Sequence, residues 1–236
     1  AGVRGFNLTV PHKVAILPLL HEQDAAARAV GAVNTVRCSD GRLMGTNTDG
    51  AGFHLSLRQD LNWSPAGKAV LLLGAGGAAR SVAQALLQDG AALLTIANRT
   101  LAHAQELAEL LATRFPRQRV RAVALDALGA ERPHLLVNAT TVGMGDGLCP
   151  VNLPRLGVQE AVLDIVYHPA ETPLLAQARA LRLPCANGVG MLLYQGTAAF
   201  EFWTGRAAPE EAMRQALLRG MAIQEQETAP AHDTRA

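Results

Sequence analysis

Long hydrophobic runs and clustered cysteines are both missing from this chain of 236 residues. No apolar stretch approaches the roughly 18 residues of a membrane helix, so we predict no membrane association. Cys38, Cys149 and Cys185 are odd in number and too widely spaced for a metal-ligand motif. They fit reduced thiols, which predicts a cytoplasmic protein without a metal site.

A strong charge of one sign is also absent. The formal net charge is +1, and the arginines are scattered rather than gathered into a basic stripe with interleaved aromatic residues. Nucleic-acid binding is therefore not expected. Hydrophobic residues make up 49% of the chain and charged residues 17%, a composition typical of a folded protein with a core of its own.

Lysine is scarce, because 19 of the 21 basic residues are arginine and only Lys13 and Lys68 are lysine. The alternation in residues 5–10 predicts a short strand, which Pro11 ends and after which a helix can begin. Lys13 then lies in the first turn of that helix, where the helix dipole disfavours a cation. This placement suggests a chemical role, with an ordinary exposed lysine as the alternative.

The chain divides into two regions that differ in their predicted pattern of strands and helices. Residues 1–62 predict a small α/β domain: a strand at 5–10, helices from Pro11 and at 22–30, a strand at 32–38, a hairpin turn at 39–42 and a linking helix at 53–61. Residues 63–187 alternate strands and helices, as in a doubly wound parallel sheet. The expected strands there are 69–73, 91–97, 120–124, 134–138, 161–166 and 183–186, with helices at 78–88 and 101–114.

Two further helices are predicted after this sheet, at 191–203 and 209–224. We expect residues 188–224 to return to the first domain. The last segment, 225–236, is polar and lacks periodicity, which predicts a disordered tail.

A glycine turn follows the strand at 69–73. Gly74 permits a tight turn, Gly76 allows close approach of a pyrophosphate, and Ala79 stands where a helix packs closely on the sheet. The phosphates would lie at the N-terminus of the following helix, where free N–H groups favour anions. The turn therefore predicts a dinucleotide site.

The end of the next strand reads Asn98-Arg99-Thr100. A carboxylate at this point would hold the 2′-hydroxyl of NAD, but none is present. Arg99 offers a bidentate fork for a phosphate instead, so NADP is the preferred cofactor. A solvated surface arginine is the alternative.

Several polar clusters stand near predicted strand ends, among them 31–35 and 45–50. Together with residues 5–13, the glycine turn and Asn98-Arg99-Thr100, they closely resemble the shikimate dehydrogenase family. The resemblance continues in residues 138–144, 164–167 and 187–195 and covers nearly the whole chain.

The resemblance implies a reversible reduction of 3-dehydroshikimate to shikimate with NADPH. Lys13 would be the catalytic lysine and Asp49 its carboxylate partner. The implied substrate ligands are Thr9, Asn34, Asp49 and Gln195, with Tyr167 nearby. The implied cofactor contacts are Gly74, Ala75, Gly76, Gly77 and Ala78 at the pyrophosphate, Asn98, Arg99 and Thr100 at the 2′-phosphate, and Ile165, Gly188 and Met191 at the nicotinamide.

The sequence also departs from the family pattern. Members normally begin with about 50–60 further residues, a strand and a helix among them, so the first domain is expected to be incomplete at its N-terminus. His103 stands where NADP-preferring members usually carry Arg or Lys. Ala25 stands near a frequent acid, for which the adjacent Asp24 is a candidate substitute.

Two alternatives stay open. One is a sibling enzyme that acts on quinate or an aminoshikimate with NAD or NADP, because small changes in hydroxyl contacts decide specificity. Another is a catalytically weak binding protein of the same fold. The oligomeric state is expected to be a monomer or a homodimer.

Overall fold

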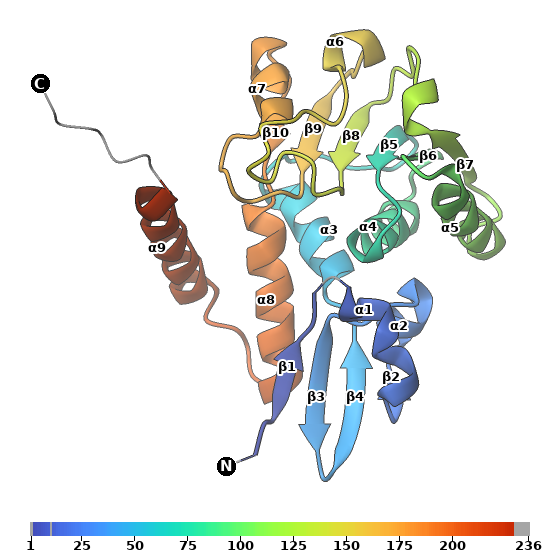
Figure 1. Cartoon of the computed structure of the whole chain (residues 1–236). Coiled ribbons are helices and arrows are strands. Elements are labelled where there is room, and N and C mark those ends of the chain that lie inside the picture. Colours follow the sequence, from blue (N-terminus) through green and yellow to red (C-terminus); the bar gives the residue numbers. More distant parts are fainter. Residues whose placement is uncertain (1, 10, 229–236) are drawn as a thin grey trace, which may run out of the picture.

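The computed structural model describes residues 2–9 and 11–228, which form two sheets joined by long helices (Figure 1). The larger sheet consists of β5 (Ala69–Leu73), β6 (Leu93–Asn98), β7 (Arg119–Ala124), β8 (Leu135–Asn138), β9 (Ala161–Asp164) and β10 (Cys185–Ala186). All six are parallel, in the order β10-β9-β8-β5-β6-β7. Because the chain winds outward from β5 in both directions, the predicted Rossmann-like fold is confirmed.

Helices cover both faces of this sheet, because its strands are apolar on both sides. Val70 and Leu72 on β5 point into one core, while Leu71 and Leu73 point into the other. The helices of the first face are α3 (Asp49–Gln59), α4 (Gly77–Gln88), α5 (Leu101–Arg114) and α8 (Val189–Thr204), and those of the second are α6 (Leu153–Leu156) and α7 (Pro173–Ala180).

The smaller sheet has the order β1-β3-β4-β2. Its strands are β1 (Gly5–Asn7), β2 (Glu22–Gln23), β3 (Thr35–Ser39) and β4 (Arg42–Thr46), accompanied by the short helices α1 (His12–Ala15), η1 (Leu17–Leu19) and α2 (Ala25–Val30). Asp40 and Gly41 have φ values of +51° and +74° between β3 and β4. The predicted hairpin is thus confirmed, with both central residues in the left-handed region.

Several predicted bounds are wrong. The helix expected over 22–30 begins only at Ala25, because Glu22 and Gln23 pair with β4 and Asp24 caps α2 by accepting a hydrogen bond from the Ala27 amide. β1 ends at Asn7, and Val10 lies outside the described residues. α3 begins four residues earlier than predicted, since Asp49 opens it.

The C-terminal region differs as well. β9 ends at Asp164, two residues before its predicted end, and the short helices α6 and α7 were not predicted. The last helix, α9 (Glu210–Thr228), continues into the segment for which we expected a disordered tail. Residues 229–236 lie outside the described part of the chain.

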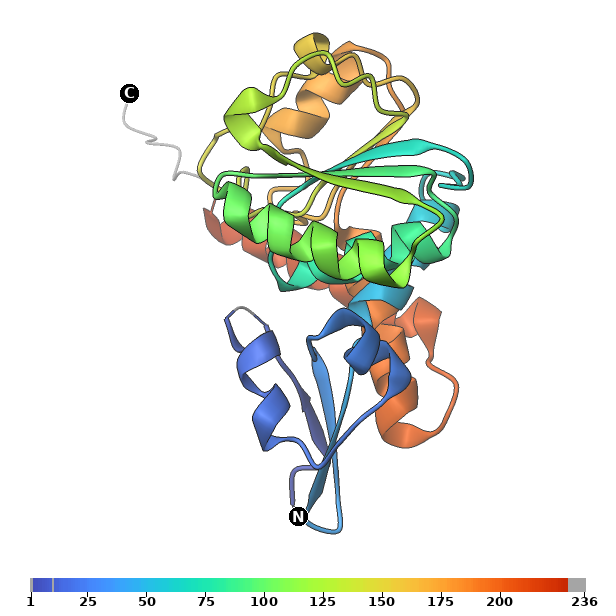
Figure 2. The same ribbon diagram turned by 90° about the vertical axis from the view of Figure 1, so that its right-hand side faces the viewer.

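α3 and α8 connect the two sheets (Figures 1 and 2). A Cβ on Gly52 of α3 would lie 2.7 Å from the Met191 oxygen of α8, so these helices touch through backbone. The far end of α8 reaches the small sheet, where the Trp203 Nε1 donates to the Val36 oxygen at 2.9 Å. α8 therefore fixes the small sheet relative to the large one. In the described residues, no helix is both long and apolar enough to cross a membrane.

Candidate active site

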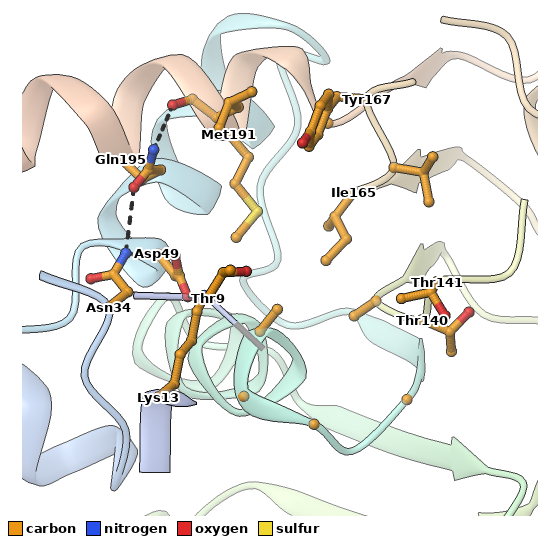
Figure 3. Close-up of a pocket in the computed structure, with 18 of the residues that line it drawn as sticks. Thr9, Lys13, Asn34, Asp49, Thr140, Thr141, Ile165, Tyr167, Met191 and Gln195 are labelled. Atoms are coloured by element: carbon orange, nitrogen blue, oxygen red, sulfur yellow. Dashed lines mark hydrogen bonds and ion pairs between the residues drawn. The ribbon is translucent and has the colours of Figure 1, made fainter. Parts of the chain in front are cut away.

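A cavity of about 750 Å³ lies between the two sheets. Its floor comes from the turns that follow β5, β8 and β9, next to the point where the strand order reverses, which is where open α/β sheets bind ligands. Figure 3 shows Lys13, Asn34 and Asp49 on one side of it and Thr140, Thr141 and Ile165 on the other. The cavity thus joins residues of both sheets.

An ion pair lies on the side of the small sheet. The Lys13 Nζ is 2.5 Å from the Asp49 Oδ2, and the two side chains are 13% and 7% exposed. Asp49 is the first residue of α3, where the helix dipole favours an anion. Lys13 belongs to the single turn of α1, so its charge is balanced by Asp49 rather than by its own helix.

Asn34 holds the other oxygen of this carboxylate. Its Nδ2 donates to the Asp49 Oδ1 at 2.7 Å and to the Thr48 Oγ1 at 2.9 Å, and it approaches the Gln195 Oε1 at 3.4 Å. Gln195 projects from α8 on the same face as Met191, one helical turn away. Buried amide, hydroxyl and carboxylate groups therefore converge on one wall, together with Thr9.

The glycine turn forms the floor of the cavity. Gly74 has φ +106°, and a Cβ there would lie 2.9 Å from the Ala139 oxygen. Gly76 precedes the first turn of α4, and in the described chain no side chain caps that turn. A Cβ on Gly76 would meet open space. Free N–H groups, the helix dipole and room beside the backbone fit the pyrophosphate of a dinucleotide.

One glycine brings distant backbone together at the opposite wall. A Cβ on Gly188 would lie 2.0 Å from the Ile165 oxygen, so only glycine fits where α8 begins behind the β9 turn. Met191 and Ile165 then present apolar side chains to the same space. This wall suits a flat ring.

The structure places nearly all of the predicted site residues in this cavity. Those that line it are Thr9, Lys13, Asn34, Asp49, Gly74, Ala75, Gly76, Gly77, Ala78, Asn98, Ile165, Tyr167, Gly188, Met191 and Gln195. Arg99 and Thr100 are exposed and outside the lining, beyond Asn98. Asp24 is also outside it, with its carboxylate occupied by the Ala27 amide and the Thr46 hydroxyl. Among the described residues, no group of three or more His, Cys, Asp and Glu could hold a metal ion.

Sequence reasoning missed part of the lining, namely Asn7, Leu8, Ala139, Thr140, Thr141, Met144, Val166 and Leu192. Four of them fall in 138–144, a polar stretch after β8 to which no role was given. Asn7 alternates with apolar neighbours in β1, and its Nδ2 donates to the Thr35 Oγ1 at 2.9 Å. This alternation of polar and apolar residues is the sequence feature that could have identified Asn7.

Asp164 supports the wall from behind. It is fully buried, and burial raises its pKa above the ordinary value, although hydrogen bonds from Thr172, Val166 and Asn138 oppose the rise. Its Oδ1 accepts from the Asn138 Nδ2 at 2.9 Å. The Asn138 Oδ1 in turn accepts from the Thr140 hydroxyl at 2.7 Å. The turns after β8 and β9 are thereby tied together.

Family models match three parts of the chain: the shikimate dehydrogenase substrate binding domain at residues 1–36, shikimate / quinate 5-dehydrogenase at 57–141, and the shikimate 5′-dehydrogenase C-terminal domain at 188–218. The NADP(+) shikimate dehydrogenase of Geobacter metallireducens is 46% identical over 225 residues, which cover 93% of this chain and 79% of the relative. The chain belongs to the shikimate dehydrogenase family. The predicted family is confirmed.

Solved structures agree with this membership. Shikimate dehydrogenase from Thermus thermophilus, in complex with NADP(H) and shikimate, is 40% identical with a TM-score of 0.81, covering 92% of this chain and 79% of that one. Quinate dehydrogenase from Corynebacterium glutamicum, in complex with NAD, is 34% identical with a TM-score of 0.85, covering 92% and 78%.

Proposed function

We propose that this protein catalyses the reversible NADP-dependent reduction of 3-dehydroshikimate to shikimate. The observation that carries the proposal is the Lys13–Asp49 ion pair at 2.5 Å in the same cavity as the glycine turn at Gly74–Ala78. NADPH, when bound, supplies the hydride. The protein must then supply a proton to the substrate oxygen.

Lys13 is the group suited to this proton transfer. As an ammonium it donates a proton to the carbonyl oxygen during reduction, and as an amine it takes the proton from the hydroxyl during oxidation. Asp49 holds the ammonium in place and balances its charge, while its second oxygen stays fixed by Asn34. The pair is thus positioned before a substrate arrives.

The remaining polar groups suit a ring that carries several hydroxyls. Asn34 and Gln195 offer amide donors and acceptors, and Thr9 offers a hydroxyl. Tyr167 stands at the edge of the cavity and is 37% exposed, which suits a residue that covers the bound ring. We assign substrate binding to these four residues and to Asp49.

For the cofactor, we assign the pyrophosphate to the glycine turn, the nicotinamide to Ile165, Gly188 and Met191, and the 2′-phosphate to Asn98, Arg99 and Thr100. Arg99 is exposed, as a residue that meets a phosphate at the cavity rim should be. With histidine at position 103, the 2′-phosphate meets less positive charge than it would with Arg or Lys there. We further propose a cytoplasmic protein, acting as a monomer or a homodimer.

Quinate is the second candidate substrate, because a quinate dehydrogenase with NAD is among the similar solved structures. Initial rates of oxidation of shikimate and quinate, each with NAD and with NADP, separate the candidates. We expect shikimate with NADP to give the highest kcat/KM, by about tenfold or more. A higher value for quinate, or for NAD, would reassign the substrate or the cofactor, and no turnover with any pair would indicate a binding protein.

A further inference from the structure

Asn47 lies in the turn between β4 and α3, two residues before Asp49, and its side chain is 5% exposed. Its Oδ1 accepts a hydrogen bond from the Asp49 amide at 3.1 Å and another from the Ser81 hydroxyl at 3.0 Å. Its Nδ2 donates to the Ala32 oxygen at 3.0 Å. An amide meets all three partners, whereas a carboxylate would place a second acceptor against the Ala32 oxygen.

Ser81 belongs to α4, the helix that begins at the glycine turn, and it is fully buried. Its hydroxyl lies 3.0 Å from the Asn47 Oδ1 and 3.3 Å from the Gly77 oxygen of its own helix. A hydroxyl has one proton, so it favours the shorter contact. The Asn47–Ser81 bond therefore links the small sheet to the first turns of α4.

The segment before β3 completes the network. Asn47 holds the Ala32 oxygen, the Val33 amide donates to the Lys13 oxygen at 2.8 Å, and Asn34 holds the Asp49 carboxylate. Three consecutive residues, 32–34, thus hold the turn that contains Asn47, the backbone of Lys13 and the carboxylate of Asp49. A shift of Asn47 would move both members of the ion pair.

α4 also touches the lysine directly. A Cβ on Gly77 would lie 3.3 Å from the Lys13 Cδ, so the aliphatic stem of Lys13 rests on the helix N-terminus that we assign to the pyrophosphate. The cofactor end and the substrate end of the cavity are therefore joined twice, once through the Lys13 stem and once through Asn47 and Ser81.

We infer that Asn47 is a positioning residue for the Lys13–Asp49 pair, and that its bond to Ser81 couples cofactor binding to substrate binding. The inference rests on the proposed function. A ligand that fixes the start of α4 also fixes Asn47, and with it Asp49. NADPH therefore strengthens shikimate binding, and shikimate strengthens NADPH binding by the same factor.

The test is the Kd of shikimate, measured by calorimetry with and without saturating NADPH, a pair that cannot react. In the native protein we expect NADPH to lower this Kd by about fivefold or more. In Ser81→Ala, we expect NADPH to lower the Kd of shikimate by less than about twofold. The Kd of shikimate measured without NADPH should stay within about twofold of the native value. Asn47→Ala loses the coupling too, and its kcat falls at least about tenfold with KM for shikimate within about threefold.

Ser56→Ala is the matched control. Ser56 is also a fully buried serine with one side-chain hydrogen bond, to Asp60 at 2.7 Å, and it belongs to α3 rather than α4. We expect this variant to keep the native coupling. The double variant Asn47→Ala/Ser81→Ala should bind shikimate like Asn47→Ala alone. The reason is that both substitutions remove the same Asn47–Ser81 hydrogen bond.

Native coupling in Ser81→Ala, equal loss in Ser56→Ala, or no coupling in the native protein would each overturn the inference. Oxidation of shikimate with NADP by the native protein is recorded on the same samples. A protein that does not oxidise shikimate would contradict the proposed function. The calorimetric Kd values test the coupling separately, because they do not depend on turnover.

Discussion

Asp164 is a buried carboxylate whose three hydrogen bonds tie the turn after β9 to neighbouring backbone and side chains. The Oδ1 accepts from the Asn138 Nδ2 and, at 3.1 Å, from the Val166 amide, while the Oδ2 accepts from the Thr172 hydroxyl at 2.7 Å. An asparagine could keep the two hydrogen bonds that its oxygen accepts, and its amide could donate to the Thr172 oxygen in place of the third. The position therefore needs the shape of the group more than its charge.

This gives a prediction on pH. Because the raised pKa means that the native state holds the Asp164 proton more tightly than the unfolded chain does, native stability falls as pH rises from the ordinary pKa through the raised one. Asp164→Asn cannot ionise and lacks this fall. Urea unfolding at about pH 4 and pH 7 should show the variant gaining free energy of unfolding relative to the native protein at the higher pH.

The exposed Asp126 provides the control, since Asp126→Asn removes a carboxylate without relieving any burial. Its free energy of unfolding should follow the native protein at both pH values. If the free energies of unfolding of Asp164→Asn and the native protein differed by the same amount at both pH values, burial of Asp164 would not disfavour its charge.

At the scale of single residues, several that line the cavity were predicted where polar clusters coincide with strand ends. Lys13 stood out because the chain has only one other lysine, whereas Asp49 was named through the family resemblance that the cluster at 45–50 helps to carry. Asn47 sat in that same cluster without a role, since its partner Ser81 is distant in sequence. Spacing along a chain does not reveal a hydrogen bond between two layers.

At the scale of elements, the contact between α3 and α8 decides where the cavity wall that carries Met191 and Gln195 stands. Gly52 allows it, since a Cβ there would lie 2.7 Å from both the Met191 oxygen and the Gln195 nitrogen. On its other side, α8 is held by α9, where the Arg214 guanidinium bonds the Tyr194 hydroxyl at 3.0 Å. α8 and its site residues are thus fixed from two directions.

Gly52→Ala should therefore separate α3 from α8. We expect a loss of about 1–3 kcal/mol in the free energy of unfolding, because backbone atoms cannot yield as a flexible side chain does. The shikimate KM should rise, since Gln195 moves with α8. Urea unfolding and initial rates measure the two effects.

Gly220→Ala is the comparison, because Gly220 lies in α9 with nothing within 4 Å of its Cβ position. It should gain about 0.5–1 kcal/mol from the better helix former and keep its KM. Equal stabilities for the two alanine variants would show that the α3–α8 contact is looser than described.

Element prediction succeeded where the periodic pattern was long. The helix at 101–114 has the predicted bounds, since it spans four turns with a clear apolar face. β2 has only two residues, and its pairing with β4 is a long-range contact that no local pattern carries. Tertiary pairing, rather than propensity, sets such short elements.

For the whole molecule, the two sheets lie in separate lobes joined by α3 and α8 (Figure 2), and residues of both lobes line the cavity. The sequence predicted the larger sheet and its glycine turn, because buried parallel strands read as continuous apolar runs. Only the family resemblance put Gln195 in one site with Asn34, because no local pattern links residues 161 positions apart whose Nδ2 and Oε1 atoms lie 3.4 Å from each other. The packing of α8 brings them together.

The central claim is that Lys13 transfers the proton in a cavity shared with NADP. Lys13→Ala should lower the kcat for shikimate oxidation by at least about a hundredfold, with little change in shikimate affinity. Lys68→Ala, the only other lysine variant, removes an ion pair with Glu160 and should keep kcat within about twofold. A Lys13→Ala variant that turns over shikimate at the native rate would contradict the account.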